Sequence, residues 1–324
     1  MTSHPDDLLR QMTSDAIFDE AFAWLCKRRI NYPHNDDVWH LRFHWSRLRE
    51  QLRRDLCVGL YRFSPVRRVR GERDVFWIWA AQDALVLKCL ALVLGKFLLP
   101  LLSPFCYHLA GRGGGKGAVR AVQAAVGDAT FVFRSDVKSY YASINHECLL
   151  GLLRELVPSP VVLDLVRGYL QHLVDEDGVL RQIDLGISLG CPLSPLMGGV
   201  YLKPLDDAMM DTCLFYARFM DDWVVLARRR GELRAAIKRA NEVLESLRVV
   251  KHPDKTFVGR VARGFEFMGY RFDEESGSEG VDIASATWHN HFARLLALED
   301  DAPRVAQYQM YWWRWVESGV DLIY

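Results

Sequence analysis

The chain has 324 residues, and its 41 lysines and arginines are balanced by 41 aspartates and glutamates. This balance excludes the globally basic field that many nucleic-acid-binding proteins carry. Half of the residues are hydrophobic, which suffices for the core of one large or two ordinary domains. The seven cysteines contain no CxxC pair, so zinc and disulfide frameworks are not expected and a reducing, cytoplasmic location is favoured.

The first segment, residues 1–56, is predicted to be a helical extension. Leu41, Trp45, Leu48 and Leu52 recur at steps of four and three, which marks one apolar face of a helix. From residue 42 to residue 73 there are ten arginines and only three acidic residues. Such a segment suits a phosphate backbone, and the alternative is a solvated helix face.

The next segment combines a predicted hairpin, residues 61–79, with a long apolar helix, residues 80–99. The apolar stretch 80–102 is interrupted by one acidic residue, two lysines and a proline. It is therefore expected to be a buried helix rather than a membrane span. The glycine-rich segment 111–117 does not match the GxxxxGK[ST] spacing, because Gly117 follows the lysine. A flexible cationic loop is expected there.

Strands and helices alternate over the rest of the chain, which favours a split βαβ sheet. A polar linker at 273–280 precedes a pair of helices whose clustered aromatic residues form either a small core or a surface against a nucleic-acid duplex. The predicted helices are 118–126, 145–157, 159–174, 192–210, 231–247, 284–298 and 302–318, and the predicted strands and hairpins are 131–136, 214–226 and 264–272.

Three aspartates stand at the ends of apolar strands. Asp221 and Asp222 are adjacent within an apolar run, and Asp136 ends the strand 131–136. An Asp-Asp pair on its own is usually a solvated turn. Carboxylates amid apolar neighbours are costly to bury unless a divalent cation or another charge compensates them. Carboxylates that converge from strand ends would meet the needs of a two-metal phosphoryl-transfer site.

Five sequence blocks, in order, resemble those of bacterial reverse transcriptases related to group II introns. Two further blocks, 61–69 and 106–112, resemble degenerate fingers motifs, so the likeness spans roughly residues 55 to 272. The five blocks are Asp136–Ile144, Gly186–Leu196, Phe219–Asp222, His252–Thr256 and Phe265–Tyr270.

The resemblance implies an α+β right-hand polymerase that follows the N-terminal extension. Its expected parts are fingers at 57–130, a palm with a split βαβ sheet at 131–272, and a short helical thumb at 281–324. Parts of 145–185 are expected to return to the fingers.

The implied reaction is RNA-directed DNA polymerisation, in which dNTPs are added to a primer 3′-hydroxyl by a two-metal mechanism. Asp136 and Asp221 are expected to bridge two Mg²⁺ ions, with Mn²⁺ as the alternative metal and the Val137 carbonyl as an extra ligand. Asp222 is expected to support the site and to bind metal less directly. Lys255 is a candidate proton donor to pyrophosphate or charge stabiliser, or otherwise a surface lysine.

The resemblance also suggests residues that bind the nucleotide. Tyr141 occupies the position that packs under the sugar and favours dNTPs, although a core aromatic is the alternative. Leu189, just before Gly190, stands where the family commonly carries a glutamine that contacts the nucleotide and template, so fidelity is in question. The usual Lys-x-Arg-Pro-Leu stretch is absent, which makes Arg67, Arg68 and Arg73 the candidates for triphosphate contact.

The expected partners are an RNA template, a DNA or RNA primer and dNTPs, with no membrane. The template is expected to be a dedicated noncoding or intron-derived RNA, with a protein partner as a further possibility. Two alternatives stay open: a maturase-like RNA-binding cofactor, and a domesticated polymerase that serves phage defence or DNA repair. The intact Asp136, Asp221 and Asp222 argue against the cofactor alternative.

Overall fold

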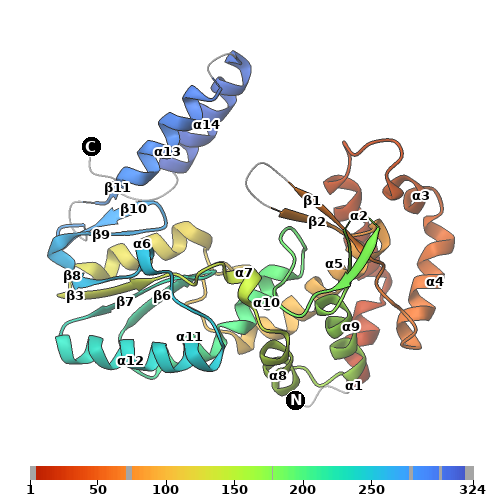
Figure 1. Ribbon diagram of the computed structural model, residues 1–324, viewed down its shortest axis with the longest axis horizontal. Helices are drawn as coiled ribbons and strands as arrows, with labels where there is room; N and C mark the ends of the chain where they lie inside the picture. Colours follow the sequence, from red (N-terminus) through yellow and green to blue (C-terminus); the bar gives the residue numbers. More distant parts are fainter. Residues whose placement is uncertain (1–4, 71–74, 177, 277–279, 299–300, 318–324) are drawn as a thin grey trace. The chain divides into compact units, whose positions relative to one another are not determined.

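The computed structural model describes residues 5–70, 75–176, 178–276, 280–298 and 301–317 (Figure 1). The chain forms two compact units, each assembled from two stretches of sequence. The N-terminal unit comprises Met1–Leu102 and Ser139–Tyr201, and the carboxylate unit comprises Ser103–Lys138 and Leu202–Tyr324. The predicted boundary at residue 130 does not coincide with a unit boundary, because residues 103–130 pack with the segments that carry the three aspartates.

The N-terminal unit begins with helices, as predicted for residues 5–56. Polar side chains cap two of them: Ser14 accepts a hydrogen bond from the Ile17 N–H, and Asp36 accepts one from the Val38 N–H. The helices are α1 Pro5–Met12, α2 Asp15–Arg28, α3 Asp37–Phe43 and α4 Trp45–Cys57.

Helix α5, Ala81–Leu98, is the apolar helix predicted from the sequence. It is followed by the 3₁₀ turn η1, Leu99–Leu101, and this segment is long and apolar enough to cross a membrane by length and composition alone. Eleven of the α5 residues are buried, and α5 packs against α1, α2 and α3. Its apolar side chains therefore serve the core of the N-terminal unit, as the sequence indicated.

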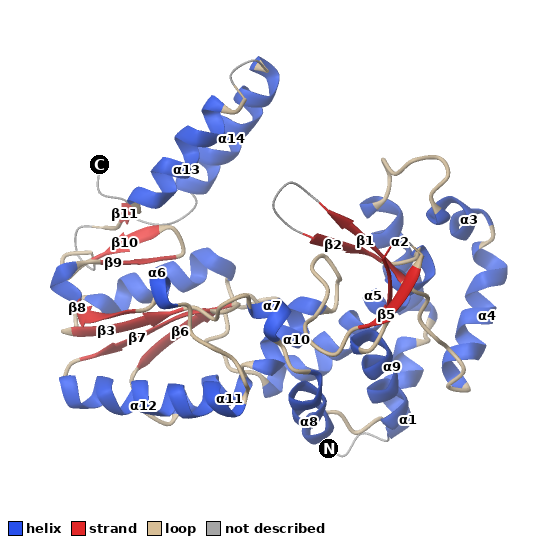
Figure 2. Ribbon diagram, in the orientation of Figure 1, coloured by secondary structure: helices blue, strands red, loops and turns tan. Residues whose placement is uncertain are grey.

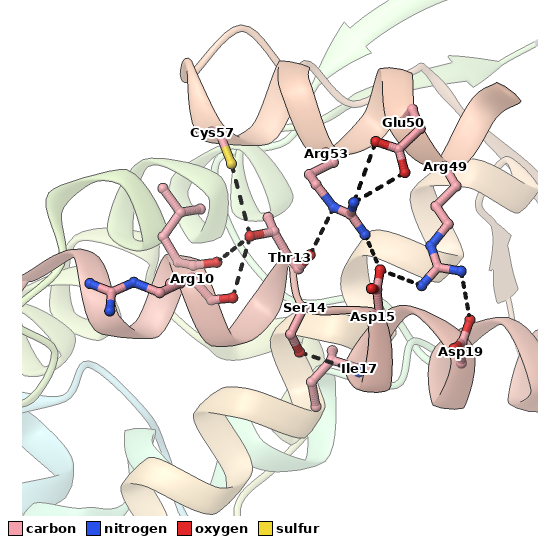
Figure 3. A network of polar contacts seen from close by, with 11 residues as sticks. Arg10, Thr13, Ser14, Asp15, Ile17, Asp19, Arg49, Glu50, Arg53 and Cys57 are labelled. Carbon is pink, nitrogen blue, oxygen red and sulfur yellow. Dashed lines mark hydrogen bonds and ion pairs between the residues drawn. The ribbon is translucent and has the colours of Figure 1, made fainter. Parts of the chain in front are cut away.

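Part of the arginine-rich segment is neutralised within the N-terminal unit (Figure 3). Arg49 forms ion pairs of 2.6 Å with Asp15 and 3.0 Å with Asp19, and Arg53 pairs with Asp15 and Glu50. These contacts fix α4 against α2, so the two arginines serve the fold rather than a phosphate backbone.

A four-stranded sheet of order β2-β1-β4-β5 completes the N-terminal unit (Figure 2). The predicted hairpin 61–79 is present as β1, Val66–Arg70, and β2, Val75–Ile78. The predicted helix 159–174 is wrong in its last turn, because residues 173–174 open β4, Leu173–Glu176, which pairs with β5, Val179–Gln182. The other elements of this unit are α7 Tyr140–Ser143, α8 His146–Leu156, α9 Pro160–Leu170 and α10 Ser194–Tyr201.

The carboxylate unit is built on an antiparallel sheet of order β6-β7-β3-β8. This is the strand order of a split βαβ unit, as predicted. Helix α6 contacts β6 and β7, and α12 contacts β3 and β7 on the other face, where α11 lies beside α12 (Figure 1). The strands are β3 Phe131–Ser135, β6 Phe215–Phe219, β7 Asp222–Ala227 and β8 Phe257–Arg260, and the helices are α6 Gly114–Val126, α11 Lys203–Met210 and α12 Arg230–Ser246.

Two sequence predictions need correction here. The predicted helix 192–210 is two helices, α10 and α11, which break at Leu202 just before Pro204 because proline favours the first turn of a new helix. The predicted loop 111–117 is only half a loop, since α6 already begins at Gly114. The buried face of α6, which includes Val119 and Val122, packs into the hydrophobic core on the sheet.

A three-stranded sheet and two helices follow. Met268 and Gly269 both have positive φ angles, 51° and 85°, as a two-residue hairpin turn requires. In the final helix pair the His291 ring stacks on Trp312 at 3.9 Å, whereas Tyr311 and Trp313 are more than half exposed. The aromatic residues thus form both a small core and an exposed surface. The elements are β9 Phe265–Phe267, β10 Tyr270–Phe272, β11 Asp282–Ile283, α13 Ser285–Leu296 and α14 Ala302–Glu317.

Candidate active site

Strand β3 carries Asp136 to its position in the carboxylate unit. The strand pairs with β7 on one side and β8 on the other, and Asp136 follows directly after its last residue, Ser135. The Asp136 carbonyl accepts a 2.7 Å hydrogen bond from the His252 N–H, which anchors the backbone at this point. The Asp136 side chain is only 5% exposed.

The β6–β7 turn carries Asp221. Strands β6 and β7 end at the pair Phe219–Asp222, so Met220 and Asp221 form the turn. Met220 adopts a left-handed φ of 58°, an uncommon conformation for a residue with a side chain. Its N–H donates a 3.1 Å hydrogen bond to Nδ1 of His108. The turn that presents Asp221 is therefore held from outside the hairpin.

A second support for this turn is the fully buried Arg218. Its guanidinium donates hydrogen bonds of 2.7 and 2.6 Å to the two oxygens of Asp206, and a third of 2.6 Å to the Met220 carbonyl. The Tyr216 hydroxyl donates a further 2.8 Å hydrogen bond to Asp206. These contacts join α11 to the turn, so the charge of Arg218 is compensated in the protein interior.

Asp136 and Asp221 form a pair of interacting, largely buried carboxylates. The pKa of Asp221 is raised well above the ordinary range, first by burial and then by the neighbouring Asp136 carboxylate. Oδ1 of Asp136 is buried and accepts no hydrogen bond from the described residues. Two like charges in this setting repel each other unless a proton or a cation lies between them.

Asp222 is in a different environment. Nε and Nη2 of Arg134 donate hydrogen bonds of 3.1 and 3.0 Å to its two carboxylate oxygens. Burial raises the pKa of Asp222, and the Arg134 ion pair opposes this rise. Nη1 of Arg134 donates to the Lys255 carbonyl at 3.1 Å, and the Lys255 ammonium pairs with Oδ2 of Asp136. Lys255 is thus in direct contact with the carboxylate pair.

The donor set of this site fits a hard divalent cation. Oδ1 of Asp136 is buried and unsatisfied, and carboxylate oxygens are the preferred ligands of Mg²⁺. Val137, whose carbonyl the sequence analysis named as an extra ligand, directly follows Asp136 and lies opposite Lys251 in an isolated β-bridge. Among the described residues no three His, Cys, Asp or Glu side chains converge as a ready metal cluster. Both carboxylate oxygens of Asp222 accept hydrogen bonds from Arg134.

The predicted nucleotide residues lie in the N-terminal unit. The Tyr141 carbonyl accepts a 2.7 Å hydrogen bond from the Ile187 N–H, so the glycine block packs against Tyr141 as a continuous backbone contact. Gly186 has a φ of 88°, and a Cβ at this position would lie 3.0 Å from the Ala142 carbonyl oxygen. Gly198 approaches the Tyr141 ring, since a Cβ there would lie 3.2 Å from Cε1. Gly186 therefore packs against the backbone of this segment, and Gly198 packs against the Tyr141 ring.

Leu189 and Gly190 line a cavity of about 310 Å³ in the same unit. Its walls include Trp77, Arg28 and Arg29, but Tyr141 is not among the lining residues. Arg28 is exposed, whereas Arg29 is buried and pairs with two aspartates.

Of the three arginines predicted to contact the triphosphate, the structure describes the side chain of Arg67. The Arg67 side chain is exposed on β1, and the backbone of Arg68 lies on the same strand. The Arg68 side chain and the whole of Arg73 lie outside the described residues. Arg28, which the sequence analysis did not single out, is an additional basic residue beside Leu189.

Sequence reasoning missed Arg134, Arg218 and His108. Each of the two arginines places a charge within a largely apolar strand. Arg134 lies in Phe131–Ser135, and Arg218 lies in Phe215–Phe219. Such a charge is costly unless it is paired, so each arginine implied a buried acidic partner. His108 carried no comparable signal.

Comparison with known proteins identifies the family. The sequence model of the family described as "Reverse transcriptase (RNA-dependent DNA polymerase)" matches residues 84–272, more than half of the chain. The chain belongs to the reverse transcriptase family. The matched region contains Asp136, Asp221 and Asp222, together with Lys255.

Curated relatives of this reverse transcriptase agree with that assignment. It is 22% identical over 291 residues to Protein YkfC of Escherichia coli (strain K12), with 76% of each chain covered. It is also 22% identical to the Group II intron-encoded protein LtrA of Lactococcus lactis subsp. cremoris, over 58% of this chain and 32% of LtrA. The chain thus spans about a third of the length of LtrA.

A solved structure is also similar to this reverse transcriptase. A chain of the "Partial Cas6-RT-Cas1--Cas2 complex" has a TM-score of 0.46 and 20% sequence identity, and the match covers 74% of this chain and 41% of that one.

The predicted membership of the group II intron-like reverse transcriptases is therefore confirmed. RNA-directed DNA polymerase, a nucleotidyltransferase, is confirmed as the activity of the family. A polymerase fold of mixed helices and sheets is confirmed as well. Divalent metal ions, RNA templates and nucleotide substrates are general to the family.

Proposed function

We propose that this chain copies RNA into DNA by extending a primer 3′-hydroxyl with dNTPs, and that Asp136 and Asp221 hold the divalent cations, preferably Mg²⁺. The observation that carries this proposal is the buried carboxylate pair, in which Oδ1 of Asp136 has no donor and the pKa of Asp221 is raised by burial and by Asp136. Bound Mg²⁺ would supply charge neutralisation for phosphoryl transfer.

The remaining residues of the site would orient this pair. Arg134 donates hydrogen bonds to both oxygens of Asp222, so Asp222 would support the site and bind metal less directly than Asp136 and Asp221. Lys255 would leave Asp136 when the cations bind, which frees its ammonium to stabilise or protonate the departing pyrophosphate. The Val137 carbonyl would complete the ligand set.

The proposed division into polymerase parts follows the elements. The sheet β6-β7-β3-β8 would be the palm, the N-terminal unit would contribute the fingers, and α13 with α14 would form the thumb. Tyr141 would exclude ribonucleotides, while Leu189, Gly190 and Arg67 would contact the template and nucleotide. We further propose a dedicated noncoding or intron-derived RNA as the native template, and a cytoplasmic location, which the seven free cysteines support.

Primer extension on an RNA template with Mg²⁺ and dNTPs tests the proposal. Asp136→Asn and Asp221→Asn should each reduce the extension rate by at least about a thousandfold, because charge stabilisation is the main catalytic contribution. Asp128→Asn, which changes an exposed aspartate of the same unit, should leave the rate unchanged.

A second readout separates metal binding from catalysis. Electron paramagnetic resonance measures Mn²⁺ binding in the absence of nucleic acid. The affinity for Mn²⁺ should fall in Asp136→Asn and Asp221→Asn and stay unchanged in Asp128→Asn. Wild-type protein that extends no primer with either Mg²⁺ or Mn²⁺ would instead favour the maturase-like RNA-binding role.

A further inference from the structure

A cavity of about 390 Å³ is lined by residues of α12 and of the edge strand β8 in the carboxylate unit. Figure 1 shows α12 on one face of this sheet. Its floor is apolar and its rim is basic. Phe131, Leu233 and Ile237 are buried or partly buried and form the floor, whereas Val258 is 52% exposed. The rim consists of the exposed arginines Arg230, Arg234, Arg260 and Arg263.

The local sequence brings the four arginines together. Arg230 and Arg234 are one turn apart on α12, so their side chains share a helix face. Arg260 is the last residue of β8 and pairs with Phe131 of β3, and its guanidinium lies 5.9 Å from the Phe131 ring. Arg263 ends the short 3₁₀ turn η3, Val261–Arg263, which follows β8.

None of the four arginines forms an ion pair with an acidic residue within the described parts of the chain, and all four are exposed. The nearby acidic residues have other partners. Asp128 forms an ion pair with Arg228 at 3.2 Å, and the Glu232 carboxylate accepts a hydrogen bond from the Arg229 N–H at 3.0 Å. The cavity rim is therefore a region of positive electrostatic potential in a chain whose overall charge is zero.

The cavity is separate from the catalytic carboxylates. Phe131, at its floor, begins β3, and Asp136 lies five residues further along, just past the other end of the strand. At the rise of an extended strand these two positions are roughly 17 Å apart. A ligand in the cavity would therefore not contact the reacting groups.

We propose that this cavity binds a single-stranded segment of RNA outside the copied region, with phosphates on the arginine rim and one unstacked base on the apolar floor. Arginine forks match phosphate oxygens, and a strand with free bases can stack on an aromatic floor such as Phe131. A duplex cannot offer such a base. This inference rests on the proposed function, because the RNA would be the continuation of the template.

The test is RNA binding by the full chain, measured by fluorescence anisotropy. The variant Arg230→Gln/Arg260→Gln should bind an unstructured RNA of about 30 nucleotides about tenfold more weakly than wild type at physiological salt, because two phosphate contacts are lost. The slope of log K against log salt should fall by about 1.4, since each single-strand phosphate contact contributes about 0.7. Extension of a short primer–template, whose single-stranded part is only the few nucleotides to be copied, should stay within about twofold of wild type, because the cavity lies outside the catalytic site.

The matched control is Arg154→Gln/Arg239→Gln, which removes the same charge from two exposed positions outside the cavity. Equal loss of RNA binding in the control, or no loss in Arg230→Gln/Arg260→Gln, overturns the proposal. Displacement of the RNA by free ATP at an affinity equal to that of the RNA would assign the cavity to a nucleotide instead. Failure of the polymerase proposal would appear separately, as wild-type protein that binds the long RNA yet extends no primer.

Discussion

Arg134 and Asp222 form a bidentate ion pair, with Nε–Oδ1 and Nη2–Oδ2 distances of 3.1 and 3.0 Å. Both side chains are 17% exposed, so the pair is largely removed from water. It uses both oxygens of the second aspartate in the Asp221–Asp222 sequence. The acidic pair is thereby divided, with one carboxylate facing Asp136 and the other neutralised by arginine.

Removal of Arg134 should therefore disturb the whole site. Arg134→Gln leaves the Asp222 charge uncompensated beside Asp136, and we expect a loss of about 3 kcal/mol in the free energy of unfolding. The extension rate should fall at least tenfold, on the order of 1.4 kcal/mol or more in the barrier. The double variant Arg134→Gln/Asp222→Asn removes the unpaired charge and should recover most of the stability. Urea unfolding and single-turnover extension measure both effects, and a double variant no more stable than Arg134→Gln would refute the charge argument.

The buried Arg218–Asp206 pair should contribute strongly to stability. Both side chains are fully buried, so Asp206→Asn leaves a guanidinium without its counter-charge, and we expect a loss of about 3–5 kcal/mol. The adjacent Asp207 offers a matched control, because it pairs with Lys203 at the surface, and Asp207→Asn should cost less than about 1 kcal/mol. Urea denaturation of both variants makes the comparison. Similar losses in the two variants would contradict the assignment of a special role to the buried pair.

The sequence predicted the sites of the three aspartates because the relevant information is local. Asp136 ends an apolar strand, and Asp221 and Asp222 interrupt another apolar run, so each acid could be placed at a strand end. The partner of Asp222 could not be predicted in the same way. Arg134 is 88 residues distant in sequence, and its contact depends on the register that places it opposite Val224.

The same distinction explains the error in the predicted helix 159–174. Residues Pro160–Leu170 form α9, as the apolar periodicity indicates. Residues 173–174 instead belong to β4, whose Val174 pairs in parallel with Val66 on β1. That pairing joins residues far apart in the chain, and no local pattern specifies it. The polymerase blocks were predictable from sequence order, whereas the β4–β5 extension of the N-terminal sheet was not.

His172 should make the stability of the N-terminal unit sensitive to acid. It is buried against Trp77 and Trp79, and Nδ1 lies 2.7 Å from the Tyr169 carbonyl. Burial lowers its pKa from 6.5 to about 4. The neutral ring is favoured in the folded state, so stability is full above pH 6.5 and is lost as the pH falls toward 4. Between pH 7.5 and 5.5 the loss should be about 1.4 kcal/mol.

Urea unfolding at the two pH values tests this expectation. His172→Phe keeps an aromatic ring but cannot titrate. Between pH 7.5 and 5.5 its free energy of unfolding should therefore fall by about 1.4 kcal/mol less than that of wild type. Parallel pH profiles for the two proteins would show that His172 is not the titrating group.

Leu189 should limit fidelity. It is 38% exposed and lines the cavity of the N-terminal unit, where it offers no hydrogen-bonding group. Leu189→Gln adds an amide that could bond to a correctly paired nucleotide, and one such bond is worth about 1 kcal/mol, or roughly fivefold in discrimination. Sequencing of the cDNA should show fewer substitutions. Leu189→Met, which keeps an apolar side chain of similar size, should match wild type, and an unchanged error spectrum in Leu189→Gln would exclude this role.

Tyr141 should determine sugar selectivity. The Ile187 N–H fixes its backbone by a hydrogen bond to its carbonyl, and the absence of a side chain at Gly198 allows its ring to pack closely there. Tyr141→Ala opens the space that a 2′-hydroxyl needs, and the ratio of rNTP to dNTP incorporation should rise by at least about tenfold. Tyr141→Phe keeps the ring and should retain wild-type selectivity. The ratio is read from primer extension with each nucleotide set, and equal selectivity in Tyr141→Ala and wild type would show that Tyr141 is a core residue without a role in nucleotide choice.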